Sequence, residues 1–263
     1  MKRIGYFTVM CVAMLALATA AFATPAPNSA KIDERVFNDC PLSTVVSVNA
    51  YPASISINDA TFAGCVGGAN LHVWSFSEDG GVTPTLFKNG SNFVACATFV
   101  LDGTGVGEGG LRFGPWWAPL VDGRFMANTN GEIACFGGRL PFYSFTVNHG
   151  ISYVKGTPIT LQMTYTANGL NAGSPATIQY RVTYNAVTYD SPSIPYDEGN
   201  PAEEPPHGLW GCLHDAMVGG YFQLPMGPDD QDLTATWTEI CFTNNDVVPT
   251  VPSTWGRIKT LYR

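Results

Sequence analysis

Apolar and polar residues alternate in short runs along most of the chain. The alternation is clearest at 159–165 and 178–184, where apolar side chains occupy every second position. This period of two is typical of strands with one buried face. The stretch 168–173, rich in Asn and Gly, predicts the turn of an antiparallel pair. Further runs of β-branched and aromatic residues lie at 44–48, 71–76, 93–100, 143–147 and 234–240.

Many short strands separated by Gly, Asn, Asp and Pro predict an all-β fold, an antiparallel β-sandwich of the jelly-roll type. No segment of the core shows a sustained helical period. We expect a single domain over 24–243, because sandwiches of roughly 200–250 residues are common. A proline-containing linker over 244–254 and a short tail over 255–263 follow it.

The first 23 residues have the pattern of an export signal. Lys2 and Arg3 precede an apolar run from Val9 to Ala18, and Ala21-Phe22-Ala23 fits a cleavage site. The run is shorter than the roughly 20 residues that span a membrane as a helix. We therefore expect an extracellular or cell-envelope protein with no transmembrane span after cleavage. The alternative is an uncleaved N-terminal anchor.

Cysteine usage agrees with export. Cys11 lies within the signal, and the other cysteines are Cys40, Cys65, Cys96, Cys135, Cys212 and Cys241. Six is an even number, which in an exported chain predicts up to three disulfides whose pairing the sequence leaves open. No two cysteines form a Cys-x-x-Cys motif, so a zinc ribbon or thioredoxin-type site has no support.

Charge limits the classes of partner. The chain has 13 Lys and Arg against 21 Asp and Glu, a formal charge of −8, which argues against a nucleic-acid partner. The tail is basic by contrast, and Trp255, Ile258 and Tyr262 fall at helical spacing within it. We expect the tail to be a small docking or sorting element that another component recognises. The alternative is a frayed terminus, because so short a helix is marginal in water.

Several segments resemble a group of uncharacterised exported bacterial proteins. These segments are Trp116–Phe125, Gly131–Tyr143, Pro206–Cys212, Val218–Gln223 and the terminal Thr254–Lys259. The group implies export and no particular activity. More loosely, Gly208–Gly211 followed by Ala235–Ile240 is similar to the closing strands of concanavalin-like jelly rolls. That similarity implies an architecture, because one fold hosts many functions.

Motifs of common enzymes are missing from the sequence. The glycine-rich stretch 103–110 lacks the strand–loop–helix context of a nucleotide site and is interpreted as a mobile loop. Glycoside hydrolysis needs two carboxylates across a cleft. Glu132 and Glu239 are available, but neither belongs to a recognised pair, and Glu239 is expected to face solvent. His214 and Asp215 are adjacent and point to opposite faces of a strand, which disfavours a charge relay.

Aromatic residues near arginines form the favoured binding site. The candidate residues are Trp116, Trp117, Arg124 and Arg139, and His207 with Trp210 forms a second candidate surface. At least one of the two adjacent Trp rings points away from the core if the backbone is extended. An exposed ring beside Arg or Asn can hold a sugar through CH contacts and hydrogen bonds. The alternative places both rings in the core.

Metal binding is a minor hypothesis. Asp229, Asp230 and Asp232 concentrate oxygen donors of the kind that calcium prefers, although their spacing matches no EF-hand. The alternative is a solvated acidic turn, and no other cofactor is expected.

The sequence therefore predicts a non-catalytic, exported β-sandwich protein with a glycan ligand. A secreted glycoside hydrolase or lyase with an unrecognised carboxylate pair is one alternative. A structural surface protein without a small ligand is the other.

Overall fold

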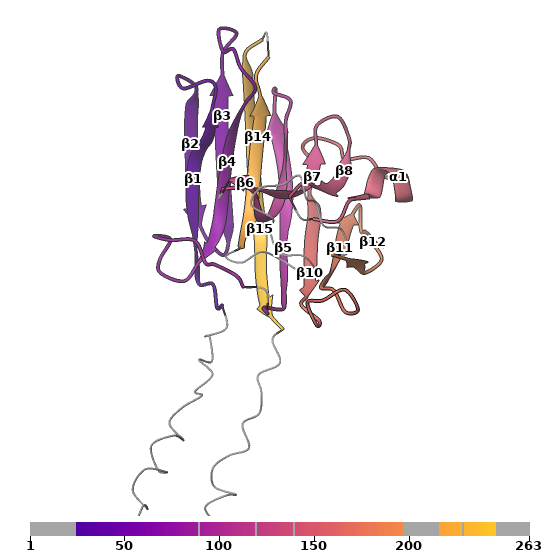
Figure 1. Ribbon diagram of the computed structural model, residues 1–263. Coiled ribbons are helices and arrows are strands. Elements are labelled where there is room, and N and C mark those ends of the chain that lie inside the picture. Colours follow the sequence, from indigo (N-terminus) through magenta and orange to yellow (C-terminus); the bar gives the residue numbers. More distant parts are fainter. Residues whose placement is uncertain are drawn as a thin grey trace, which may run out of the picture.

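The computed structural model describes residues 25–88, 90–118, 120–138, 140–196, 216–227 and 229–245, without the side chains of 114–118 and 121–122. They form two antiparallel sheets packed face to face, with one short helix (Figure 1). The first sheet, in spatial order, contains β1 (Ser29–Asn38), β4 (Ala69–Ser77), β14 (Met217–Pro225), β6 (Glu108–Ala118), β7 (Val121–Asn128), β8 (Ile133–Phe136) and β9 (Tyr143–Ser144).

The second sheet contains β12 (Val187–Asp190), β11 (Thr177–Tyr184), β10 (Ile159–Thr166), β5 (Phe93–Gly103), β15 (Gln231–Asn244), β3 (Ser54–Thr61) and β2 (Thr44–Ala50), and β13 (Ile194–Pro195) pairs with β11. The chain crosses repeatedly between the two sheets, as from β4 to β5 and from β5 to β6. The expected all-β sandwich of the jelly-roll type is confirmed.

Alternating side chains build the core between the sheets. Residues 159–166 pair in register with 177–184, and the apolar positions of both strands are buried while the intervening polar ones face outward. At the centre, the Trp74 and Trp237 rings lie edge to face at 6.1 Å. A Cβ at Gly220 would come within 2.2 Å of Trp74 Nε1, so this position in β14 has to be glycine.

The segment 143–147 was expected to be one strand, and this prediction is wrong for its second half. The strand β9 ends at Ser144, whose Oγ accepts a hydrogen bond from Val147 N at 3.2 Å. This cap begins the helix α1 (Phe145–His149), which Gly150 ends in the left-handed conformation at φ 66°. Local capping therefore outweighs the β-branched composition of the segment.

The glycine-rich stretch 103–110 is also more ordered than predicted. Its first residue ends β5, and β6 begins at Glu108, so only 104–107 connect the two strands. This connection is held to the start of β15, because Gly105 N donates to Asp232 O and Val106 N donates to Gln231 Oε1, both at 3.0 Å.

Two disulfides confirm part of the cysteine prediction. Cys40 joins Cys65, and Cys96 on β5 joins Cys241 on the neighbouring β15. Cys135 on β8 is a buried free thiol, and burial raises its pKa. Its expected disulfide is therefore not formed within the described part of the chain, and Cys212 lies outside it.

Both ends of the described chain lie at one end of the sandwich (Figure 1). Asn244, the last residue of β15, donates from Nδ2 to Pro25 O at 3.2 Å. The turn from β14 to β15 lies at the opposite end. The proposed signal, the tail and most of the linker fall outside the described residues. Within the described part, no helix has the length and apolar character needed to cross a membrane.

Candidate functional site

A surface hollow of about 390 Å³ lies on the outer side of the first sheet, at the end away from Pro25 and Asn245. It is lined by Val106, Gly107, Glu108, Asn128, Thr129, Asn130, Gln223 and Pro225. These residues come from the 104–107 connection, the start of β6, the end of β7 with its following turn, and the end of β14. The volume is within the range of small-molecule sites, about 300–1,000 Å³.

Strand register brings the polar residues of the hollow together. Glu108 on β6 is the direct partner of Gln223 on β14 and of Asn128 on β7. Directly opposite residues of antiparallel strands point to the same face. The three side chains therefore meet on the outer face of the sheet, although Gln223 is distant from the other two in the sequence.

Arg124 on β7 holds Glu108 and Gln223 in place through hydrogen bonds. Its Nη1 donates to Glu108 Oε1 at 2.5 Å and its Nη2 donates to Gln223 Oε1 at 2.8 Å. Asn128 Nδ2 donates to the other carboxylate oxygen, Glu108 Oε2, at 3.3 Å. The Arg124 and Glu108 side chains are 9% and 14% exposed, so the ion pair is largely shielded from water.

The guanidinium group of Arg124 packs against the aromatic ring of Tyr221. The guanidinium carbon lies 4.9 Å from the centre of the Tyr221 ring, a cation–π contact. Burial raises the pKa of Tyr221 well above its ordinary value, and the negative charge of Glu108 raises it further. Tyr221 is therefore held in its protonated form, and its ring supports Arg124.

Donor groups remain available along the rim of the hollow. Gln223 uses its Oε1 for Arg124, and its Nε2 makes no hydrogen bond to another described residue. Thr129 Oγ1 accepts from Gly107 N at 2.9 Å, which leaves its hydroxyl proton to donate. Asn130 accepts from Glu132 N through Oδ1, which leaves its Nδ2 amino group. Val106, 55% exposed, adds an apolar surface beside these donors.

The predicted binding residues have different outcomes. Arg124 holds the polar groups of the hollow, although it is buried and does not present its charge to solvent. Trp116 and Trp117 belong to β6, but their side chains are not described. Arg139, His207 and Trp210 lie outside the described residues, as do His214 and Asp215. The aromatic-platform hypothesis therefore stays a prediction.

The residues that line the hollow were not singled out from the sequence. Glu108 lies in the glycine-rich stretch that was interpreted as a mobile loop, and Gln223 lies near the end of β14. The run Asn128–Gly131 carries a turn signal, which indicates a surface position. Nothing local in the sequence shows that these three segments meet.

The calcium hypothesis gains no support. Asp230 Oδ1 accepts from Ala63 N at 2.8 Å, and Asp232 Oδ1 accepts from Asn58 Nδ2 at 2.6 Å. Among the residues that the structure describes, no three His, Cys, Asp or Glu side chains are grouped to hold a metal. One carboxylate oxygen of Asp230 and one of Asp232 are therefore engaged by protein donors.

The carboxylates considered for hydrolysis lie on the surface. Glu132 is exposed in the turn before β8, outside the set that lines the hollow. Glu239 faces solvent as expected, from a bulge in β15, and accepts from Thr98 Oγ1 at 2.8 Å. Glu108 is the one carboxylate among the described lining residues of the hollow.

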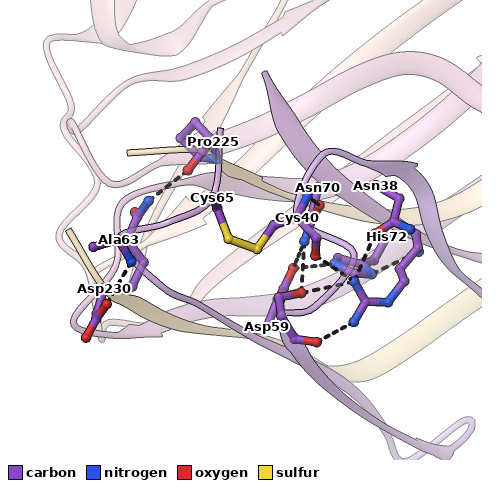
Figure 2. Close-up of a disulfide and its surroundings, with 12 residues drawn as sticks. Asn38, Cys40, Asp59, Ala63, Cys65, Asn70, His72, Pro225 and Asp230 are labelled. Atoms are coloured by element: carbon purple, nitrogen blue, oxygen red, sulfur yellow. Dashed lines mark hydrogen bonds and ion pairs between the residues drawn. A yellow bond between two sulfur atoms is a disulfide. The ribbon is translucent and has the colours of Figure 1, made fainter. Parts of the chain in front are cut away.

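A second polar group, beside the Cys40–Cys65 disulfide, contains a His–Asp pair (Figure 2). We call it the buried polar cluster, and it consists of Arg35, Ser43, Asp59, Asn70 and His72. Asp59 Oδ2 lies 3.0 Å from His72 Nε2 and accepts from Asn70 Nδ2 at 2.6 Å. His72 Nδ1 accepts from Arg35 N at 3.2 Å, which favours the neutral tautomer with a proton on Nε2.

The centre of this cluster is closed to solvent. Asp59, Asn70 and His72 are each 0% exposed, between the two sheets. Burial acts to raise the pKa of Asp59, but hydrogen bonds from His72, Ser43 and Asn70 outweigh it, and the pKa lies below its ordinary value. A substrate cannot reach the His–Asp pair, so we interpret it as structural.

No protein-family model matches the chain, and no curated protein sequence matches it. Among solved structures, an alginate lyase from Corynebacterium sp. has a TM-score of 0.43 at 11% identity, covering 82% of this chain and 94% of the lyase. Lectin I from Ulex europaeus has a TM-score of 0.39 at 9% identity, covering 82% of this chain and 92% of the lectin.

A functionally unknown protein from Saccharomyces cerevisiae has a TM-score of 0.40 at 9% identity, covering 77% of this chain and 96% of that protein. These similarities are too distant to transfer an activity. The function has to be argued from the geometry of the site.

Proposed function

We propose that this chain is an exported, non-catalytic β-sandwich protein that binds a glycan in the hollow beside Glu108 and Gln223. The observation that carries the proposal is the combination of spare amide and hydroxyl donors with an apolar wall. Sugar rings present hydroxyl groups at their rim and apolar CH groups on their faces, so they match such a surface. Gln223 Nε2, Thr129 Oγ1 and Asn130 Nδ2 supply the donors, and Val106 supplies part of the wall.

Export is part of the same proposal. The two disulfides support it, because disulfides persist in oxidising compartments and are rare in the cytosol. The signal-like residues 1–23 and the basic tail 255–263 are the segments that would direct the protein to its location. Deleting Trp255–Arg263 tests the tail: the protein is expected to lose its normal location, and an unchanged location and surface yield would contradict a sorting role.

Binding is favoured over hydrolysis because the hollow lacks a second carboxylate among its described residues. Glu108 is neutralised by Arg124 and hydrogen-bonded by Asn128, so it is held as an acceptor. A glycosidase needs two carboxyl groups about 5–10 Å apart in distinct protonation states. Incubation with polysaccharides should therefore release no new reducing ends. Turnover that disappears in Glu132→Gln would overturn this assignment.

A glycan array with matched variants tests the binding role. Gln223→Leu and Thr129→Val each remove one donor from the hollow, and each should weaken binding about tenfold, equivalent to about 1.4 kcal/mol. Gln162→Leu on the outer face of β10 is the control, since it makes the same chemical change on the other sheet. Absence of any glycan ligand, or equal losses in the control, would contradict the proposal.

A further inference from the structure

We propose that the hollow selects uncharged sugars and discriminates against uronates and other acidic sugars. This inference rests on the proposed glycan-binding function and names the ligand class of the same site. It follows from the hydrogen bonds and ion pairs that the basic side chains around the hollow already make within the protein.

Arg124 is the cation next to the hollow, and both of its terminal nitrogens are engaged. Nη1 donates to Glu108 and Nη2 donates to Gln223, while the guanidinium plane lies against Tyr221. Carboxylate ligands are recognised through charge-assisted, usually bidentate, contacts to Arg. A sugar carboxylate would have to displace Glu108 from its 2.5 Å contact with Arg124. The side chains of Arg124 and Glu108 are only 9% and 14% exposed, so this ion pair is largely shielded from water.

Other basic side chains nearby bond to the protein and lie outside the set that lines the hollow. Arg112, the fully buried direct partner of Arg124 across β6 and β7, donates to Leu120 O at 3.1 Å and to Ser75 Oγ at 2.8 Å. Lys155 Nζ donates to Gly105 O at 2.9 Å in the 104–107 connection. Among the described residues that line the hollow, none is Lys or Arg.

The charges beside the hollow offer an anion no net attraction. An acidic sugar would place its carboxylate near that of Glu108, whose charge Arg124 already balances, so no net positive charge remains there to hold the anion. The formal charge of −8 on the whole chain adds a longer-range repulsion toward polyanions.

The groups that line the hollow suit hydroxyls instead. Amide side chains both donate and accept, and a hydroxyl does the same, so neighbouring sugar hydroxyls can be satisfied without any net charge. Gln223 is held in one orientation because Arg124 fixes its Oε1, and its Nε2 is thereby fixed as a donor. Arg124 is thus a positioning residue for Gln223.

Matched pairs of oligosaccharides that differ only at C6 test the selectivity. We would titrate the whole protein with β-1,4-linked mannotetraose and tetramannuronate, cellotetraose and tetraglucuronate, and α-1,4-linked galactotetraose and tetragalacturonate. For any pair that binds, the neutral member is expected to bind at least about tenfold more tightly. Equal or tighter binding of the acidic member would overturn the selectivity while leaving glycan binding intact. If an array also shows no glycan ligand, the proposed function itself fails.

A gain-of-function variant tests the stated cause. Asn130 is exposed in the turn, and Asn130→Lys places an unpaired cation at the rim of the hollow. The acidic member should then bind about tenfold more tightly than it binds the unchanged protein. Thr188→Lys, at an exposed position on β12 in the other sheet, is the control and should leave both members unchanged. Equal gains in both variants would mean that net charge alone, and not the hollow, sets the preference.

Discussion

The buried polar cluster and the hollow each hold a carboxylate with hydrogen bonds from neighbouring strands, but water reaches only one of them. Asp59 is 0% exposed and lies with His72 between the sheets, where the disulfide Cys40–Cys65 closes one side. Glu108 lies on the outer face, in an ion pair that borders an open hollow. A His–Asp pair is a common catalytic arrangement. The hollow is nevertheless the better candidate for a ligand-binding site, because its amide and hydroxyl donors are still available to a ligand.

This contrast predicts different costs of mutation. Inside the sandwich, water cannot replace a lost partner, so a deleted side chain leaves its neighbours unsatisfied. At the hollow, water can enter and take the place of a missing group. Substitutions in the buried polar cluster should therefore act on stability, and substitutions in the hollow should act mainly on binding.

The largest expected effect is that of Asp59→Ala, which removes the acceptor shared by His72 and Asn70. The free energy of unfolding should fall by about 3 kcal/mol, measured by urea denaturation. Asp232→Ala is the matched control, because Asp232 also accepts from an Asn side chain but is exposed, and it should cost no more than about 1 kcal/mol. Equal costs at the two positions would contradict the structural role of the cluster.

An intermediate effect is expected for the ion pair behind the hollow. A double-mutant cycle of Glu108→Gln and Arg124→Met should give a coupling energy of about 1–2 kcal/mol, since the pair is largely shielded. The pair Arg181–Asp190, at 43% and 40% exposure, should give less than about 1 kcal/mol in the same cycle. A smaller value for Glu108–Arg124 than for Arg181–Asp190 would show that the hollow is as open to water as the rest of the surface.

The smallest expected effect is a change in stability at acidic pH. The pKa of Asp59 is lower in the folded protein than its unfolded value of about 3.9. Its stabilisation is therefore complete above that value and is lost as the pH falls through the lower, folded pKa. The stability difference between the unchanged protein and Asp59→Asn should narrow as the pH falls below about pH 4. A difference that widens in acid would mean that the pKa is raised in the folded state.

The fold was predictable where the alternation of apolar and polar residues within a single strand shows which face is buried. The alternation at 159–165 and 178–184 gave the antiparallel pair and the buried face, because a period of two is a local property of the chain. The helix α1 was missed because one capping hydrogen bond from Ser144 and one left-handed residue, Gly150, decide it. Neither of these changes the apolar pattern.

The site was predictable only in part, because it depends on the order of strands in space. Arg124 was selected from the sequence, but its partners come from β6 and β14, and β14 follows β6 by about a hundred residues. Alternation tells which face a residue occupies and not which strand lies beside it. The pairing of Cys96 with Cys241 was open for the same reason, since it requires β5 and β15 to be neighbours.

The positions of Pro25 and Asn245 at one end of the sandwich, and of the hollow at the other, give the molecule a polarity along its long axis. If either terminus were fastened to a support, the rigid body of the two sheets would act as a spacer. The hollow would then lie at the far end of the sandwich from the support, at a distance set by the length of the strands.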